Sequence, residues 1–153
     1  MQAPQLLSAE LQSDIDAHAA DGFEMWRDNS TPEQKAIGSA EIARFVNDPE
    51  FAASEQKRME DEFNKHSVAK PGVLSQPEFI AFVNVLMEDG AKKGNYEDPR
   101  PETVLKSFAL ADRITPDAEG VSLQDWFTLA FAQIGKTQEL KTAAGLWSQI
   151  AEL

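Results

Sequence analysis

Four acidic residues and two hydroxyl residues lie close together near the middle of the second half of the sequence: Asp112, Asp117, Glu119 and Asp125, with Thr115 and Ser122 among them. Carboxylate and hydroxyl oxygens are the ligands that calcium and magnesium prefer in proteins. The sequence therefore predicts a weak or irregular ion site at these four acids. Because Asp125, the last of these acids, reaches less far than a Glu and tends toward monodentate binding, the pattern suits magnesium better than calcium.

Catalytic chemistry is poorly represented elsewhere in the chain. The two histidines, His18 and His66, lack the spacing of a zinc site and are interpreted as surface helix residues. The sequence holds no cysteine, no glycine-rich phosphate loop and no Gly-x-Ser-x-Gly turn. We therefore expect a protein that is not an enzyme.

The composition limits the size and the partners of the protein. Its 153 residues are enough for one domain or two small helical lobes. The sequence has 26 acidic and 14 basic residues. The resulting net charge of −12 repels nucleic acid and anionic membranes and favours basic partners. No apolar run is long enough to span a membrane and no secretion signal is visible, so we expect a cytoplasmic protein.

The apolar residues recur at helical spacing, which predicts an all-α fold. The first helix is expected to begin after Ser8 and to reach about Asn29. Further helices are expected at about 39–47, 51–66, 76–89, 101–113, 123–134 and 138–152. The segment 90–100, which is rich in glycine and mixed charge, is predicted to link a lobe at 1–89 to a lobe at 101–153.

Three helix–loop–helix units can be superimposed on one another, with loops at 30–41, 67–78 and 112–125. Each loop has an aliphatic residue four places before its closing acid. These pairs are Ile37 with Glu41, Leu74 with Glu78, and Val121 with Asp125. Apolar residues follow each acid at the same phase, which a single amphipathic helix does not explain.

This pattern resembles the EF-hand superfamily, in its calmodulin-like or sarcoplasmic calcium-binding-protein-like form with degenerate loops. The resemblance covers about residues 15–134. It implies short β pairing between neighbouring loops, with Ile37 beside Leu74. Val121 then lacks a partner unit.

The residues at the chelating places depart from that family. The first loop has Ser30, Pro32 and Gln34 there, and the second has Ser67, Ala69 and Pro71, although Gly72 supplies the turn. We expect calcium binding to be lost in both loops. The boxes at Ser75–Glu78 and Ser122–Asp125 also cap helices in proteins that bind no calcium.

A C-terminal helix with an apolar stripe is expected to begin near Thr137 and to lie in the groove of the third unit. The predicted partner groove comprises six apolar residues: Trp126, Leu129, Phe108, Phe82, Leu86 and Met87. The leading hypothesis is a non-enzymatic interaction or regulatory protein that binds a partner protein or a basic or amphipathic helix. The alternatives are a calcium buffer or sensor that uses the third loop, and an unrelated acidic helical bundle.

Overall fold

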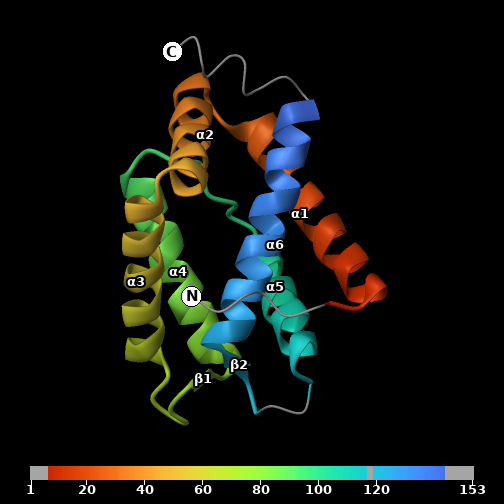
Figure 1. Cartoon of the computed structure of the whole chain (residues 1–153), viewed down its shortest axis with the longest axis vertical. Coiled ribbons are helices and arrows are strands. Elements are labelled where there is room, and N and C mark those ends of the chain that lie inside the picture. The colour runs from red at the N-terminus through yellow and green to blue at the C-terminus, as the bar shows by residue number, and fades with distance from the viewer. Residues whose placement is uncertain (1–6, 117–118, 144–153) are drawn as a thin grey trace.

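The computed structural model describes residues 7–116 and 119–143. Within these ranges the chain forms six helices and two short strands. Figure 1 shows how they are arranged. In chain order they are α1 (Ala9–Asn29), α2 (Pro32–Asn47), α3 (Pro49–His66), β1 (Val73–Leu74), α4 (Gln76–Lys92), α5 (Pro101–Ile114), β2 (Val121–Ser122) and α6 (Leu123–Ala143). The prediction of a mostly helical fold is confirmed.

Side-chain caps explain where several helices begin. The backbone N–H of Leu11 donates to Ser8 Oγ at 3.2 Å at the start of α1. Thr31 and Gln34 form a reciprocal capping box, and Ser75 and Glu78 form another. The start of α1 and the box before α4 agree with the predictions.

The two strands form an antiparallel pair at one end of the molecule, opposite α2 (Figure 1). Leu74 lies beside Val121, and Val73 lies beside Ser122. Both Leu74 and Val121 are fully buried. The sheet therefore joins the helix pair α3 and α4 to the helix pair α5 and α6.

Two glycines make this pairing of loops sterically possible. Gly72 has a φ of +91°, which L-residues with side chains rarely adopt. A Cβ at Gly120 would lie 2.5 Å from the carbonyl oxygen of Leu74. A side chain at position 120 would therefore push the two loops apart.

The predicted loop at 30–41 is wrong. The chain bends only at residues 30–31, and from Pro32 onward it runs as one helix through Glu41 to Asn47. The capping box at Thr31 starts this helix, and the apolar spacing of a loop flank equals that of a continuous helix. The predicted pairing of Ile37 with Leu74 is wrong for the same reason, since Ile37 is helical and Leu74 pairs with Val121.

The separate helix predicted from Thr137 is also wrong at its start. Thr137 lies inside α6, which continues through Gly135 to Ala143 without a break. Gly135 is a helix-weakening residue, but it does not end this helix. Residues 144–153, including Trp147 and Ile150, lie outside the described residues.

One hydrophobic core crosses the predicted boundary between lobes. Helix α1 packs against α5 and α6 (Figure 1), and Leu11 and Ile15 share a cluster with Phe63, Phe82 and Leu129. The helices on either side of segment 90–100 are thus held in the same apolar interior. Among the described residues, no helix combines the length and the hydrophobicity that a membrane crossing needs.

Candidate functional site

A cavity of about 490 Å³ lies between α1, α2, α3 and α6, and the chain at 95–97 and the first turns of α5 complete its wall. Five aromatic side chains line it: Phe23, Trp26, Phe45, Phe51 and Tyr96. Sites for small molecules in proteins have volumes of about 300 to 1,000 Å³ and mostly apolar walls with a few polar groups. This cavity has both properties.

Within each helix, the residues that line the cavity recur at helical spacing. Helix α2 lines the cavity with Gly38, Glu41, Ile42 and Phe45, at steps of three, one and three residues. Side chains at such steps share one face of a helix. The other three helices line it at the same spacing, with residues 18, 19, 22, 23 and 26 of α1, residues 51, 55, 58 and 59 of α3, and residues 133, 134, 137 and 141 of α6.

His18 lines this cavity and is only 4% exposed, so its interpretation as a surface residue was wrong. Its Nε2 lies 2.8 Å from Ser107 Oγ, and the hydroxyl of Ser107 donates to the carbonyl oxygen of Thr103 at 3.1 Å. A serine hydroxyl has one hydrogen, and the bond to Thr103 uses it, which assigns His18 Nε2 as the donor to Ser107. Nδ1 is then an acceptor, and it is buried without a hydrogen-bond partner.

The pKa of His18 is lowered, first by burial and then by the nearby charge of Lys106. The carboxylates of Asp21 and Asp98 act in the opposite direction. The imidazole is therefore held neutral near pH 7, in keeping with an Nδ1 that carries no hydrogen.

Asn95 joins the chain after α4 to helix α2. Its Nδ2 donates to Glu41 Oε2 at 2.7 Å, which assigns the amide orientation and leaves Oδ1 as the free acceptor. Asn95 Oδ1 is buried without a partner. A Cβ built on Gly38 would lie 3.6 Å from Asn95 Oδ1 and 3.3 Å from Trp26 Nε1.

Glu97 is a half-buried carboxyl group at the same cavity, and it has no hydrogen bond or ion pair with any described residue. Burial, together with the charge of Glu41, raises its pKa to about 7. The neighbouring Gly90 makes room for it, because a Cβ there would overlap the Glu97 carboxylate. The other two acids at the cavity have partners: Glu41 and Glu55 contact Lys93, and Glu55 also contacts Arg58.

Lys141 adds a buried cation to the cavity wall. Its Nζ lies 3.3 Å from Ser39 Oγ and 4.1 Å from the centre of the Trp26 ring. Burial lowers the pKa of Lys141 to about 8. The aromatic face of Trp26 thus holds an ammonium group by a cation–π contact.

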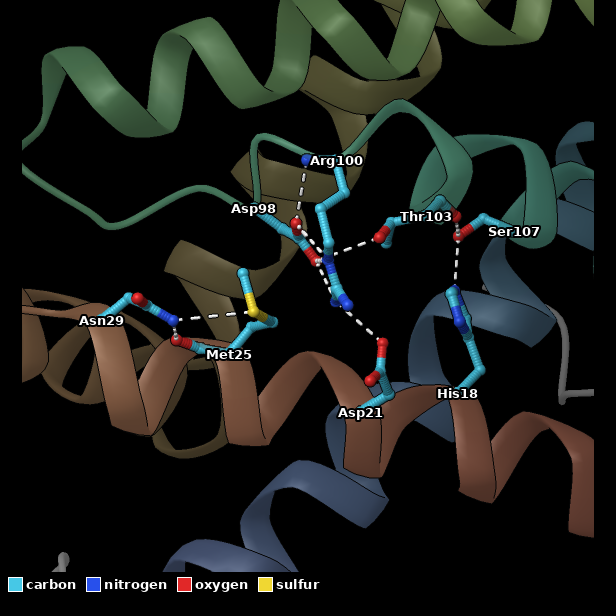
Figure 2. A network of polar contacts seen from close by, with 8 residues as sticks. All are labelled: His18, Asp21, Met25, Asn29, Asp98, Arg100, Thr103 and Ser107. Atoms are coloured by element: carbon cyan, nitrogen blue, oxygen red, sulfur yellow. Dashed lines mark hydrogen bonds and ion pairs between the residues drawn. The ribbon is translucent and has the colours of Figure 1, made fainter.

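A polar network around Asp98 and Arg100, which Figure 2 shows, fixes the chain directly after Glu97. Arg100 Nη2 donates to Asp98 and to Asp21 of α1, both at 2.7 Å, and the hydroxyl of Thr103 donates to Asp98 at 3.0 Å. The Arg100 guanidinium keeps the pKa of Asp98 below its usual range. The predicted linker is therefore held against α1 by the bond from Arg100 to Asp21.

Three of the four predicted ion ligands lie at the other end of α6, around the paired loops. Asp112 is inside α5, Glu119 is exposed and paired with Lys70, and Asp125 is buried. Asp117 lies outside the described residues. Over residues 7–116 and 119–143, no three His, Cys, Asp or Glu side chains come together as metal ligands could.

The closing acids of the two loops bind the loops' own groups. Glu78 accepts hydrogen bonds from the backbone N–H of Ser75 at 2.9 Å, and from those of Val68 and Ala69 at 3.1 Å. These bonds, with that of Ser75 the largest cause, lower the pKa of Glu78 to about 2. Asp125 accepts from the Thr115 hydroxyl at 2.8 Å, and the N–H of Ser122 donates to it at 3.3 Å.

The six residues of the predicted partner groove all lie in or against the hydrophobic core. Phe82 and Leu129 are fully buried. The Trp126 ring meets Phe82 edge-on with centroids 5.1 Å apart, and it meets Phe79 in the same way at 5.9 Å. The other four residues are partly buried, and none of the six lines the cavity.

Comparisons with known proteins leave the site to be judged on its geometry. The chain matches no protein-family model, and no curated protein and no solved structure shows a significant similarity to it.

Proposed function

We propose that this protein is a non-enzymatic binding protein that holds a small, largely apolar molecule in the cavity between α1, α2, α3 and α6. The main support for this function is the cavity itself, which has five aromatic side chains in its wall and a volume of about 490 Å³. The volume suits a small molecule better than a partner helix. The packing of Phe82 against the Trp126 ring supports the same choice, because these side chains contact the protein's own core.

We infer that this protein is EF-hand-like in its paired helix–loop–helix units. Its loops, however, need no cation to close. In that family the twelfth carboxylate binds the ion, whereas Glu78 at this place binds three backbone N–H groups of its own loop. A carboxylate with three such donors is stabilised in its charged form without a metal. Binding at the cavity should therefore not depend on calcium.

The contact between His18 and Ser107 supports a binding role rather than a catalytic one. A serine nucleophile gives its proton to a histidine base, which requires a hydrogen bond from the serine to the histidine. Here Ser107 donates to the carbonyl of Thr103, and His18 donates to Ser107. The pair has the reverse polarity of a nucleophile and its base.

A fluorescent probe tests this function. N-phenyl-1-naphthylamine is an uncharged dye at neutral pH, and its emission rises in apolar surroundings. We expect it to bind the full chain with the same affinity in millimolar calcium and in chelator. A calcium-dependent affinity would instead favour an ion sensor, and the absence of binding would contradict the proposal.

Two glycines provide a matched pair of variants. Gly22 lines the cavity and Gly135 is exposed on α6, and a Cβ meets nothing within 4 Å at either position. Both lie inside helices, so Gly22→Met and Gly135→Met should each fold. Gly22→Met should fill the cavity and weaken dye binding at least about tenfold, whereas Gly135→Met should leave it unchanged. Equal affinities in the two variants would place the dye elsewhere.

A further inference from the structure

We propose that the molecule bound in this cavity is a small organic amine, held as its cation by hydrogen bonds to His18 Nδ1, Asn95 Oδ1 and the carboxylate of Glu97. This inference rests on the binding function proposed above and names its ligand class.

The cavity wall holds polar atoms that lack a hydrogen-bond partner. In the described chain, two buried side-chain atoms at the cavity lack a hydrogen bond, namely His18 Nδ1 and Asn95 Oδ1. The Ser107 contact makes the first an acceptor, and the Glu41 contact makes the second an acceptor. Buried acceptors without donors cost free energy, so a ligand that brings N–H groups recovers it.

The charge of the cavity wall favours a cationic ligand. Glu97 is the carboxyl group at the cavity that lacks a countercharge among the described residues, since Glu41 and Glu55 are paired with Lys93 and Arg58. A protonated amine beside Glu97 would supply that charge in a partly desolvated site. It would also relieve the repulsion between Glu97 and Glu41 that contributes to the raised pKa of Glu97.

Asn95 and Glu97 both lie close to Gly90. The Glu97 carboxylate lies against Gly90, and Asn95 Nδ2 would lie 3.8 Å from a Cβ on the same glycine. Asn95 Oδ1 lies beside Gly38 and Trp26. The amide of Asn95 therefore turns Nδ2 toward the acidic part of the wall and its free acceptor Oδ1 toward the aromatic part.

The aromatic wall suits the rest of such a ligand. Phe23, Phe45, Phe51 and Tyr96 offer apolar surface for a hydrocarbon body. Aromatic rings also attract cations, and the Lys141 ammonium over the Trp26 ring already makes such a contact in this cavity. An amine with an aromatic or alkyl body matches both parts of the wall.

Three probes of similar size and different charge test the ligand class by titration calorimetry. They are 2-phenylethylamine, 2-phenylethanol and 3-phenylpropanoate, which carry a cation, no charge and an anion. We expect the wild-type protein to bind the amine at least about tenfold more tightly than the alcohol, and the anion most weakly. Near pH 7 the amine should also displace a fraction of a proton from Glu97, which calorimetry in two buffers of different ionisation enthalpy measures.

The variant Glu97→Gln keeps the size of the side chain and removes its charge. In this variant the preference for the amine over the alcohol should fall below about threefold, and the proton release should disappear. Glu102→Gln is the matched control, because Glu102 is exposed in the first turn of α5 and the change in net charge is the same. It should bind like the wild type.

The outcomes separate this inference from the proposed function. If the alcohol or the anion binds as tightly as the amine, the amine class is wrong and the cavity remains a binding site. If Glu97→Gln keeps the full amine preference, the assigned contact to Glu97 is wrong. If none of the three probes binds and the neutral dye also fails to bind, the binding function itself is wrong.

Discussion

Asn95 and Glu41 are joined by a hydrogen bond of 2.7 Å from Nδ2 to Oε2, across 54 residues of sequence. This bond ties the segment after α4 to helix α2. It closes one side of the cavity and also sets the orientation of the Asn95 amide, because a carboxylate accepts hydrogen bonds and cannot donate them when it is ionised.

Replacing Asn95 should therefore loosen the cavity wall. Asn95→Ala removes a hydrogen bond to a charged group, and such bonds contribute about 1.5 to 3 kcal/mol. Because this contact is only partly buried, we expect the free energy of unfolding in urea to fall by about 1 to 2 kcal/mol. Asn47→Ala is the control, since Asn47 is exposed and its Nδ2 donates only to Ala43 O within α2. A loss no larger than that of the control would contradict the bridging role of Asn95.

His18 should make stability depend on pH. Its pKa is lowered in the folded protein, first by burial, so below its ordinary value near 6.5 the unfolded chain takes up a proton that the folded chain resists. The stabilising effect of neutral His18 is therefore present above about pH 6.5 and is lost as the pH falls toward the folded-state pKa. His18→Gln should lose less stability than the wild type between pH 7 and pH 5 in urea titrations. His66→Gln serves as the control and should leave this difference in place.

Glu78 should stabilise the paired loops without any ion. Its pKa is lowered to about 2 by hydrogen bonds from backbone N–H groups, so its contribution is present above about pH 4.5 and is lost as the pH falls toward 2. Glu78→Gln should lower the midpoint of thermal unfolding at pH 7, and by less at low pH. Glu88→Gln, on the exposed side of the same helix, should change little. If added calcium raised the midpoint of the wild type and not that of Glu78→Gln, Glu78 would be an ion ligand and this interpretation would fail.

The sequence predicts the local structure here better than the long-range contacts. Ser8, Pro49 and the box at Ser75 and Glu78 lie where helices begin, and Gly72 marks a bend that needs positive φ. Thr31 and Gln34 carried the same kind of signal. The prediction of a loop at 30–41 disregarded this capping signal. Ile37, Glu41 and Phe45 recur at a spacing that a continuous helix shares with the flank of a loop.

The candidate site could not be predicted from local patterns. Asn95 and Glu97 stand in a stretch whose glycines and charges are typical of a linker, and the contacts to α1 and α2 that fix this stretch span 54 and 79 residues. His18 is the exception. It falls on the apolar face that Leu11, Ile15 and Phe23 define in α1, and a buried histidine could have been expected there.

Helix α6 reaches from the paired loops to the cavity as one unbroken rod. Asp125 in its first turn contacts Thr115 and Ser122, and its final turns carry Thr137 and Lys141 at the cavity wall. Since an α-helix resists bending over this length, a tilt of α6 that widens one end must displace the other. In the described part of the chain, the strand pairing and the cavity are thus connected through a single helix.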